Sequence, residues 1–136
     1  MRKPVNEAYE SIKAACLRQR EKGVEIRRGL WGADRRYVEY GLYESTYSFH
    51  TNGFTPPCGC AMSCYLVDSN VRFLPASPHN PKYGERVLAA ASALGVDPDL
   101  VAAFISGFDR KFPRRDHPHM EWFDAGARLA TELGLS

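Results

Sequence analysis

The clearest pattern near the start of the chain is a stripe of apolar residues at helical spacing. The stripe consists of Val5, Ala8, Tyr9, Ile12 and Cys16. Apolar residues that recur every three to four positions form one face of an amphipathic helix. The opposite positions carry charged residues, and Gly23 supplies a stop signal. The spacing therefore predicts a helix over residues 5–22.

The period changes after Gly23. Residues 24–27 alternate between apolar and charged side chains, which is typical of a half-buried strand. Residues 36–49 are rich in tyrosine and β-branched residues and favour a second strand, although their tyrosines also fit a helical stripe. Residues 50–60 have the composition of a loop.

A short apolar run covers residues 61–67, and the turn signal Asp68-Ser69-Asn70 follows it. Residues 71–74 then have strand character, so the two runs together predict a hairpin. The alternative is a buried helix over residues 60–67, because periodicity does not distinguish strand from helix in so short a run.

The C-terminal half has three helix signals, each opened by a residue–proline pair. These signals predict helices over residues 81–94, 98–108 and 118–133. The predicted fold class is therefore α+β, in one domain over residues 1–136. Its parts are an N-terminal helix, a small antiparallel sheet and a C-terminal cap of three short helices.

Composition and charge narrow the function only slightly. The chain has 136 residues, 44% of them hydrophobic and 25% charged, which is typical of a globular protein. The net charge is +2, but residues 1–36 hold ten Lys and Arg against five Asp and Glu. Neither a signal peptide nor a run of membrane-spanning length is recognised, so we expect a cytoplasmic protein with reduced thiols and no membrane association.

The cysteine cluster is the first candidate site. A zinc ion needs four convergent ligands. Cys58 and Cys60 form one close pair, but no second close pair follows. The sequence therefore predicts no metal and no cofactor. If a metal is bound, the ligands are expected to be His50, Cys58, Cys60 and Cys64.

The same segment suggests a weaker alternative, a cysteine hydrolase. The string Cys58-Gly59-Cys60-Ala61 resembles cysteine peptidases that carry Cys-Gly-x-Ala at the head of a buried helix. The resemblance covers about four residues and implies a cysteine nucleophile whose pKa a helix start would lower. The general base would then be His117 or His119, oriented by Asp116 or Asp124.

Two features suggest nucleic-acid binding. Residues 87–107 resemble the helix-turn-helix units of repressors, but residues 101–105 lack the polar side chains that read base edges. The second feature is the basic segment 18–36. The expected contacts with a nucleic acid or an acidic partner are Arg27, Arg28, Arg35, Arg36, Arg110, Lys111, Arg114 and Arg115.

The sequence as a whole predicts a small regulatory binding module without catalytic residues. A protein partner is the first expectation, because the basic excess is weaker than most nucleic-acid footprints. Nucleic-acid binding is the alternative. The sequence indicates neither the identity of the partner nor the oligomeric state.

Overall fold

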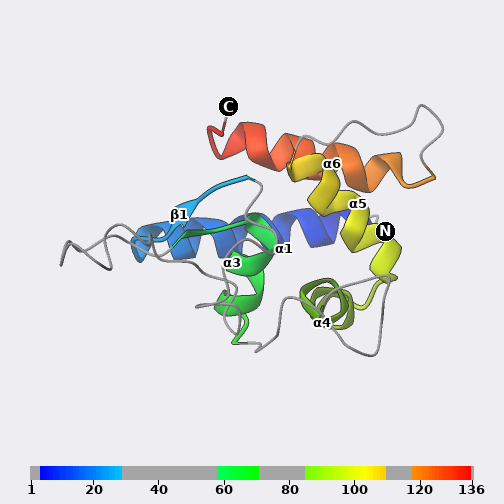
Figure 1. Cartoon of the computed structure of the whole chain (residues 1–136), viewed down its shortest axis with the longest axis horizontal. Helices are drawn as coiled ribbons and strands as arrows, with labels where there is room; N and C mark the ends of the chain where they lie inside the picture. Colours follow the sequence, from blue (N-terminus) through cyan, green and yellow to red (C-terminus); the bar gives the residue numbers. More distant parts are fainter. Residues whose placement is uncertain (1–3, 29–57, 71–84, 110–117, 136) are drawn as a thin grey trace.

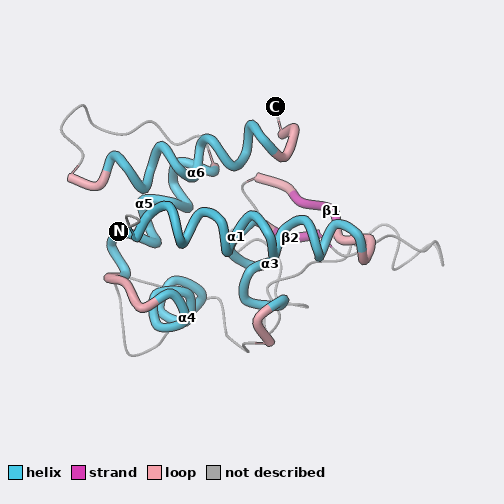
Figure 2. The backbone as a smooth tube through the Cα atoms, turned by 180° about the vertical axis from the view of Figure 1, so that it is seen from behind, coloured by secondary structure: helices cyan, strands magenta, loops and turns pink. Residues whose placement is uncertain are grey.

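A computed structural model describes residues 4–28, 58–70, 85–109 and 118–135. These residues form five helices and one pair of short strands (Figures 1 and 2). The elements, in chain order, are α1 (Pro4–Glu21), β1 (Glu25–Ile26), β2 (Cys58–Gly59), α3 (Ala61–Asp68), α4 (Glu85–Leu94), α5 (Pro98–Phe108) and α6 (Met120–Glu132).

The prediction of an α+β fold with an antiparallel sheet is wrong. The described part of the chain is mostly helical, and its single strand pairing joins β1 to β2 over two residues in parallel. Two strands are too short to cover a core, so the helices bury the apolar surface instead. The strands predicted at 36–49 and 71–74 lie outside the described residues.

The segment predicted first as half of a hairpin is the helix α3. Cys60 begins it as the N-cap, and its Sγ accepts a hydrogen bond from the backbone N–H of Ser63 at 3.4 Å. Five of the eight helical residues are buried, including Met62, Cys64 and Leu66. A helix that is covered on most sides has no polar face, which removes the helical period from its sequence.

The predicted N-terminal helix and the three C-terminal helices are confirmed. α4 is described from Glu85, because residues 81–84 lie outside the described part. α5 begins at Pro98, where the Asp97 side chain accepts a hydrogen bond from the N–H of Asp99 at 2.8 Å. α6 begins at Met120, two residues later than predicted.

α1 lies along the long axis of the molecule, with α6 beside it in the same direction and α3 against it (Figure 1). Several polar contacts join these helices near their C-terminal ends. Arg20 donates to the carbonyl oxygen of Leu133, and Arg18 donates twice to the Asp68 carboxylate, at 2.7 and 2.9 Å. The Arg18 guanidinium, more than any other cause, lowers the pKa of Asp68.

α5 and α6 cross at two glycines. A Cβ atom built on Gly107 would lie 1.9 Å from the carbonyl oxygen of Phe123, and one built on Gly126 would lie 2.0 Å from that of Phe104. The two backbones therefore touch, and any side chain at either position would force them apart. This contact fixes α6 against α5 and buries Phe104 and Phe108.

One apolar core is built from all five described helices and β1. Its largest fully buried side chains are Phe104, Phe108, Ile12, Met62 and Leu66. None of the described helices is by itself long and apolar enough to cross a membrane, although α4 and α5, bent by 115°, pass that test together by length and composition.

Candidate binding surface around α6

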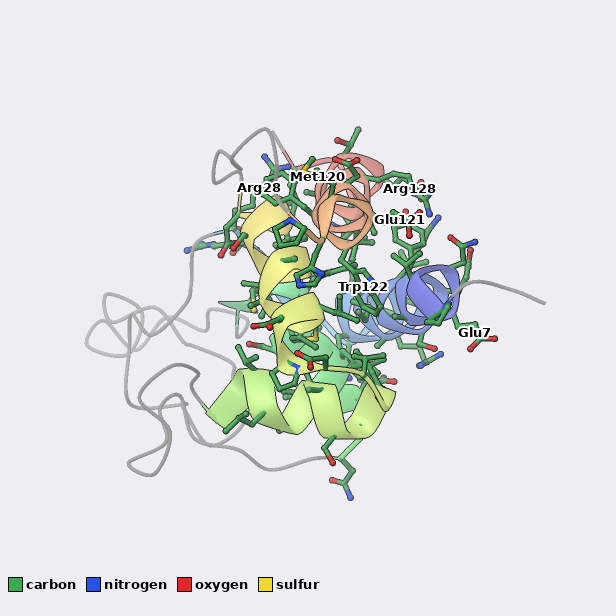
Figure 3. The ribbon with its side chains drawn as sticks, turned by 90° about the vertical axis from the view of Figure 1, so that its right-hand side faces the viewer. Glu7, Arg28, Met120, Glu121, Trp122 and Arg128 are labelled. Atoms are coloured by element: carbon green, nitrogen blue, oxygen red, sulfur yellow. The ribbon has the colours of Figure 1, made fainter. Side chains whose placement is uncertain are left out.

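A groove of about 360 Å³ runs between α1 and α6, which we call the α1–α6 groove. Val5 and Ala125 contribute apolar atoms and are buried, whereas Glu121 and Asp124 are exposed. Figure 3 shows Glu121 and Arg128 on the side of α6 that faces α1, while Trp122 points inward. The complete lining is Val5, Asn6, Glu121, Asp124, Ala125 and Arg128.

Arg128, which lines this groove, also contacts Tyr9 of α1. The Arg128 guanidinium lies 3.8 Å above the centroid of the Tyr9 ring, a cation–π contact. Its Nε also lies 3.5 Å from a carboxylate oxygen of Glu132. Glu132 in turn accepts a hydrogen bond from Lys13, which lowers the pKa of that carboxyl. The Arg128 guanidinium therefore contacts Tyr9 and Glu132 while it lines the groove, and Glu121 and Asp124 add two carboxylates to the same lining.

Burial is the main cause that raises the pKa of Tyr9, and Glu132 raises it further. The ring is 2% exposed and stays neutral at physiological pH. Tyr9 is thus a buried structural residue that joins α1 to α6 through its contact with Arg128.

A second groove, of about 290 Å³, lies on the other side of the start of α6, which we call the α5–α6 groove. Ala102 and Ala103 give it an apolar floor, and Ser106 adds a hydroxyl. Asp99, on the first turn of α5, supplies a carboxylate. Pro118 and His119 complete the lining from the residues that lead into α6.

The two grooves share one chemical character. Each has a floor of small apolar side chains, each carries at least one carboxylate, and each is open to solvent. Lysine and arginine have an apolar stem and a cationic end, so their side chains match such a groove. Both grooves border the first turns of α6, which makes this end of the molecule a candidate surface for basic side chains.

The described cysteines that were predicted as possible metal ligands, Cys60 and Cys64, have structural roles in α3. Cys60 is the N-cap of α3, and its Sγ also lies 3.2 Å from the Ser63 hydroxyl oxygen. Cys64 is fully buried. His50 lies outside the described residues, as does the side chain of Cys58. Within the described ranges, no group of three His, Cys, Asp or Glu side chains is arranged to hold a metal ion.

The described residues that were suggested for a cysteine hydrolase lie in different parts of the structure. Cys60 caps α3, whereas His119 lines the α5–α6 groove. Asp124 lines the α1–α6 groove. Asp116 and His117 fall outside the described part of the chain.

Two of the eight predicted basic contacts are described. Arg27 forms an exposed ion pair with Glu25 at 2.8 Å. The Nε and Nη1 atoms of Arg28 are buried. Both arginines follow β1, and neither lines one of the two grooves around α6. The other six, Arg35, Arg36, Arg110, Lys111, Arg114 and Arg115, lie outside the described residues.

The segment that resembles a helix-turn-helix has the corresponding bend. α4 and α5 turn by 115° around Gly95, which adopts a φ of +69°. However, α5 buries Val101 and Phe104 and packs against α6. A helix that reads DNA must present polar side chains to the major groove. The burial of α5 favours a packing role for this helix.

Sequence reasoning missed both grooves. Asn6, Glu121 and Arg128 sit at solvent-facing positions of amphipathic helices, and nothing in their local pattern distinguishes them from other surface residues. The signal that was available is the pair of acidic residues at the start of α6, next to an alanine.

Comparison with protein-family models, with curated proteins and with solved structures finds no match to this chain.

Proposed function

We propose that the chain is a binding module for a protein partner that presents lysine or arginine side chains to the two grooves beside α6. The observation that carries the proposal is the repeated chemistry of these grooves, an apolar floor with carboxylates. The stem of a basic side chain packs on Val5 and Ala125, and its charged end reaches Glu121 or Asp124.

The shape of the grooves favours a macromolecule over a small metabolite. Small-molecule sites have volumes of about 300–1,000 Å³ and enclose most of the ligand. The α1–α6 groove, of about 360 Å³, is at the low end of that range, the α5–α6 groove, of about 290 Å³, is just below it, and both are open to solvent. Side chains projecting from a larger partner occupy such sites without needing enclosure.

The carboxylates also select the partner and orient it on this surface. Exposed ion pairs contribute about 0.2–1 kcal/mol each, so they select and orient a partner more than they hold it. The apolar floors must supply the remaining affinity. The partner is therefore expected to combine basic residues with apolar ones, and its binding is expected to weaken as the salt concentration rises.

The test is a selection from a random peptide library on the immobilised protein, followed by affinity measurements on the selected peptides. We expect enrichment of lysine and arginine beside apolar residues. The double variant Glu121→Gln/Asp124→Asn removes two carboxylates from the α1–α6 groove. It is expected to weaken binding by about 1 kcal/mol, or roughly fivefold.

The matched control is Glu10→Gln/Glu21→Gln, which removes the same charge from exposed positions of α1 outside both grooves. The control is expected to bind like the parent. Equal losses in both double variants would assign binding to overall charge and would refute the groove. Tight, salt-sensitive binding to random DNA or RNA that disappears in the Arg27, Arg28, Arg35 and Arg36→Ala variant would favour a nucleic-acid partner instead.

A further inference from the structure

Two thiols meet in the core where α1 packs against α3. Cys16 and Cys64 are each 0% exposed. The Sγ of Cys16 lies 3.7 Å from the carbonyl oxygen of Ala61, which is one helical turn before Cys64. Side chains on a helix lean back toward the preceding turn, so the Cys64 thiol extends over Ala61 as well. Both thiols therefore lie at the contact between α1 and α3, on the turn of α3 that carries Ala61.

The pKa of Cys64 also reflects the neighbouring Cys16 thiol. A hydrogen bond with the Cys16 thiol is the main cause that raises the pKa of Cys64 well above its usual range, and burial raises it further. A neutral thiol is a weak nucleophile, because the thiolate is the reactive form. The pair is therefore stable in the reduced state, and its oxidation is slow because both thiols are buried and protonated.

We propose that Cys16 and Cys64 are a disulfide-forming pair that a peroxide oxidises to a covalent link between α1 and α3. One thiolate attacks a peroxide oxygen, the O–O bond breaks, and a sulfenic acid and one water result when the peroxide is hydrogen peroxide. The second thiol then attacks the sulfenic sulfur, which forms the S–S bond and releases a second water. Two thiols and one hydrogen peroxide thus give one disulfide and two waters.

Cys60 is the described thiol nearest in sequence to this pair, and its position gives it another role. Its Sγ accepts the hydrogen bond from the N–H of Ser63 and lies beside the Ser63 hydroxyl. These contacts hold the Cys60 side chain over the start of α3, where it caps the helix. The geometry therefore distinguishes the capping cysteine from the pair at the contact between α1 and α3.

The link would change stability strongly, because positions 16 and 64 are 48 residues apart in the chain. A disulfide that closes a long loop restricts the unfolded chain and stabilises the folded state. For a domain of this size, the expected rise in Tm is roughly 10 °C. It would also fasten α1, which provides one wall of the α1–α6 groove.

The experiment exposes the reduced protein to hydrogen peroxide, removes the peroxide, and counts thiols after denaturation. The expected result is a fall from four thiols to two, with peptide mapping that finds Cys16 joined to Cys64 and a raised Tm that returns to its original value after reduction. Cys60→Ser keeps a capping oxygen and is expected to lose two thiols like the parent. Cys16→Ala and Cys64→Ala are expected to form no such link.

Peptide mapping of the parent protein decides the proposal even if a core variant fails to fold. A disulfide that contains Cys58 or Cys60, or one that joins two molecules, would overturn it. So would four remaining thiols under conditions in which the denatured chain is readily oxidised.

Discussion

Replacing Gly126 with alanine tests the crossing of α5 and α6 by the sign of its effect. Alanine is about 1 kcal/mol more favourable than glycine inside a helix, so a free helix would gain stability from this change. In the protein, the new Cβ would lie 2.0 Å from the carbonyl oxygen of Phe104 and 2.9 Å from the backbone nitrogen of Phe108. Both neighbours are backbone atoms, which do not rotate away.

The magnitude follows from how far the helices must move. Real Cβ contacts essentially never fall below 3.0 Å, so the Phe104 carbonyl must retreat by at least 1.0 Å. Inserting an extra methyl group into a packed site costs about 1–3 kcal/mol or more. The retreat also loosens the packing of Phe104 and Phe108. After the helical gain is subtracted, we expect Gly126→Ala to destabilise the protein by about 2 kcal/mol.

The assay is urea unfolding followed by far-ultraviolet circular dichroism. The expected result is a lower midpoint with an unchanged slope, and a Tm lower by roughly 5–10 °C. The control is Ala127→Gly in the same helix, which removes a methyl group and is expected to cost about 1 kcal/mol through helix propensity. An alanine variant at 126 that is as stable as the parent, or more stable, would refute the close crossing.

Three further predictions concern the core, the thiols and the dependence on pH. Phe104→Ala is expected to lower the free energy of unfolding by about 3–5 kcal/mol, since the side chain is 1% exposed; a loss below about 1 kcal/mol in urea unfolding would contradict this burial. Thiol titration of the denatured protein, purified without an oxidant, is expected to find four thiols, and a smaller number or stoichiometric zinc would contradict the expectation of reduced cysteines. The lowered pKa of Asp68 stabilises the fold above the unfolded-state pKa of about 4, and this contribution is lost as the pH falls through the folded-state pKa. Asp68→Asn is therefore expected to be less stable than the parent at neutral pH and to lose less stability as the pH falls through the folded-state pKa of Asp68. Parallel pH profiles of stability would exclude a contribution from the Arg18 contact.

The helices that the sequence predicts correctly are those with one buried and one exposed face. α1 and α6 have such faces, and α5 is marked by Asp97 and Pro98 at its start. The sequence predicts a hairpin first at α3, because five of its eight residues are buried and no exposed polar face reveals the helical period. Its distinguishing feature is the Cys60 cap, and cysteine is not among the common N-cap residues.

The grooves around α6 were beyond sequence reasoning for a different reason. Asn6 and Asp124 are 118 positions apart, and each is an ordinary surface residue on its own helix. Asn6 and Asp124 line the same groove because α1 and α6 lie parallel and side by side, and the contact of Tyr9 with Arg128 stabilises this arrangement. The close approach of α5 to α6 depends in turn on Gly107 and Gly126, whose role is visible only once the two backbones are placed.

The most direct test of the proposed function maps where a basic ligand binds. The ¹⁵N-labelled protein is titrated with a short peptide of alternating lysine and leucine residues, and separately with its glutamate–leucine counterpart. The proposal predicts that the lysine peptide shifts the backbone amide signals of Asn6, Asp124 and Ser106, and that the glutamate peptide does not. Shifts confined to residues outside the two grooves, or equal shifts with both peptides, would contradict it.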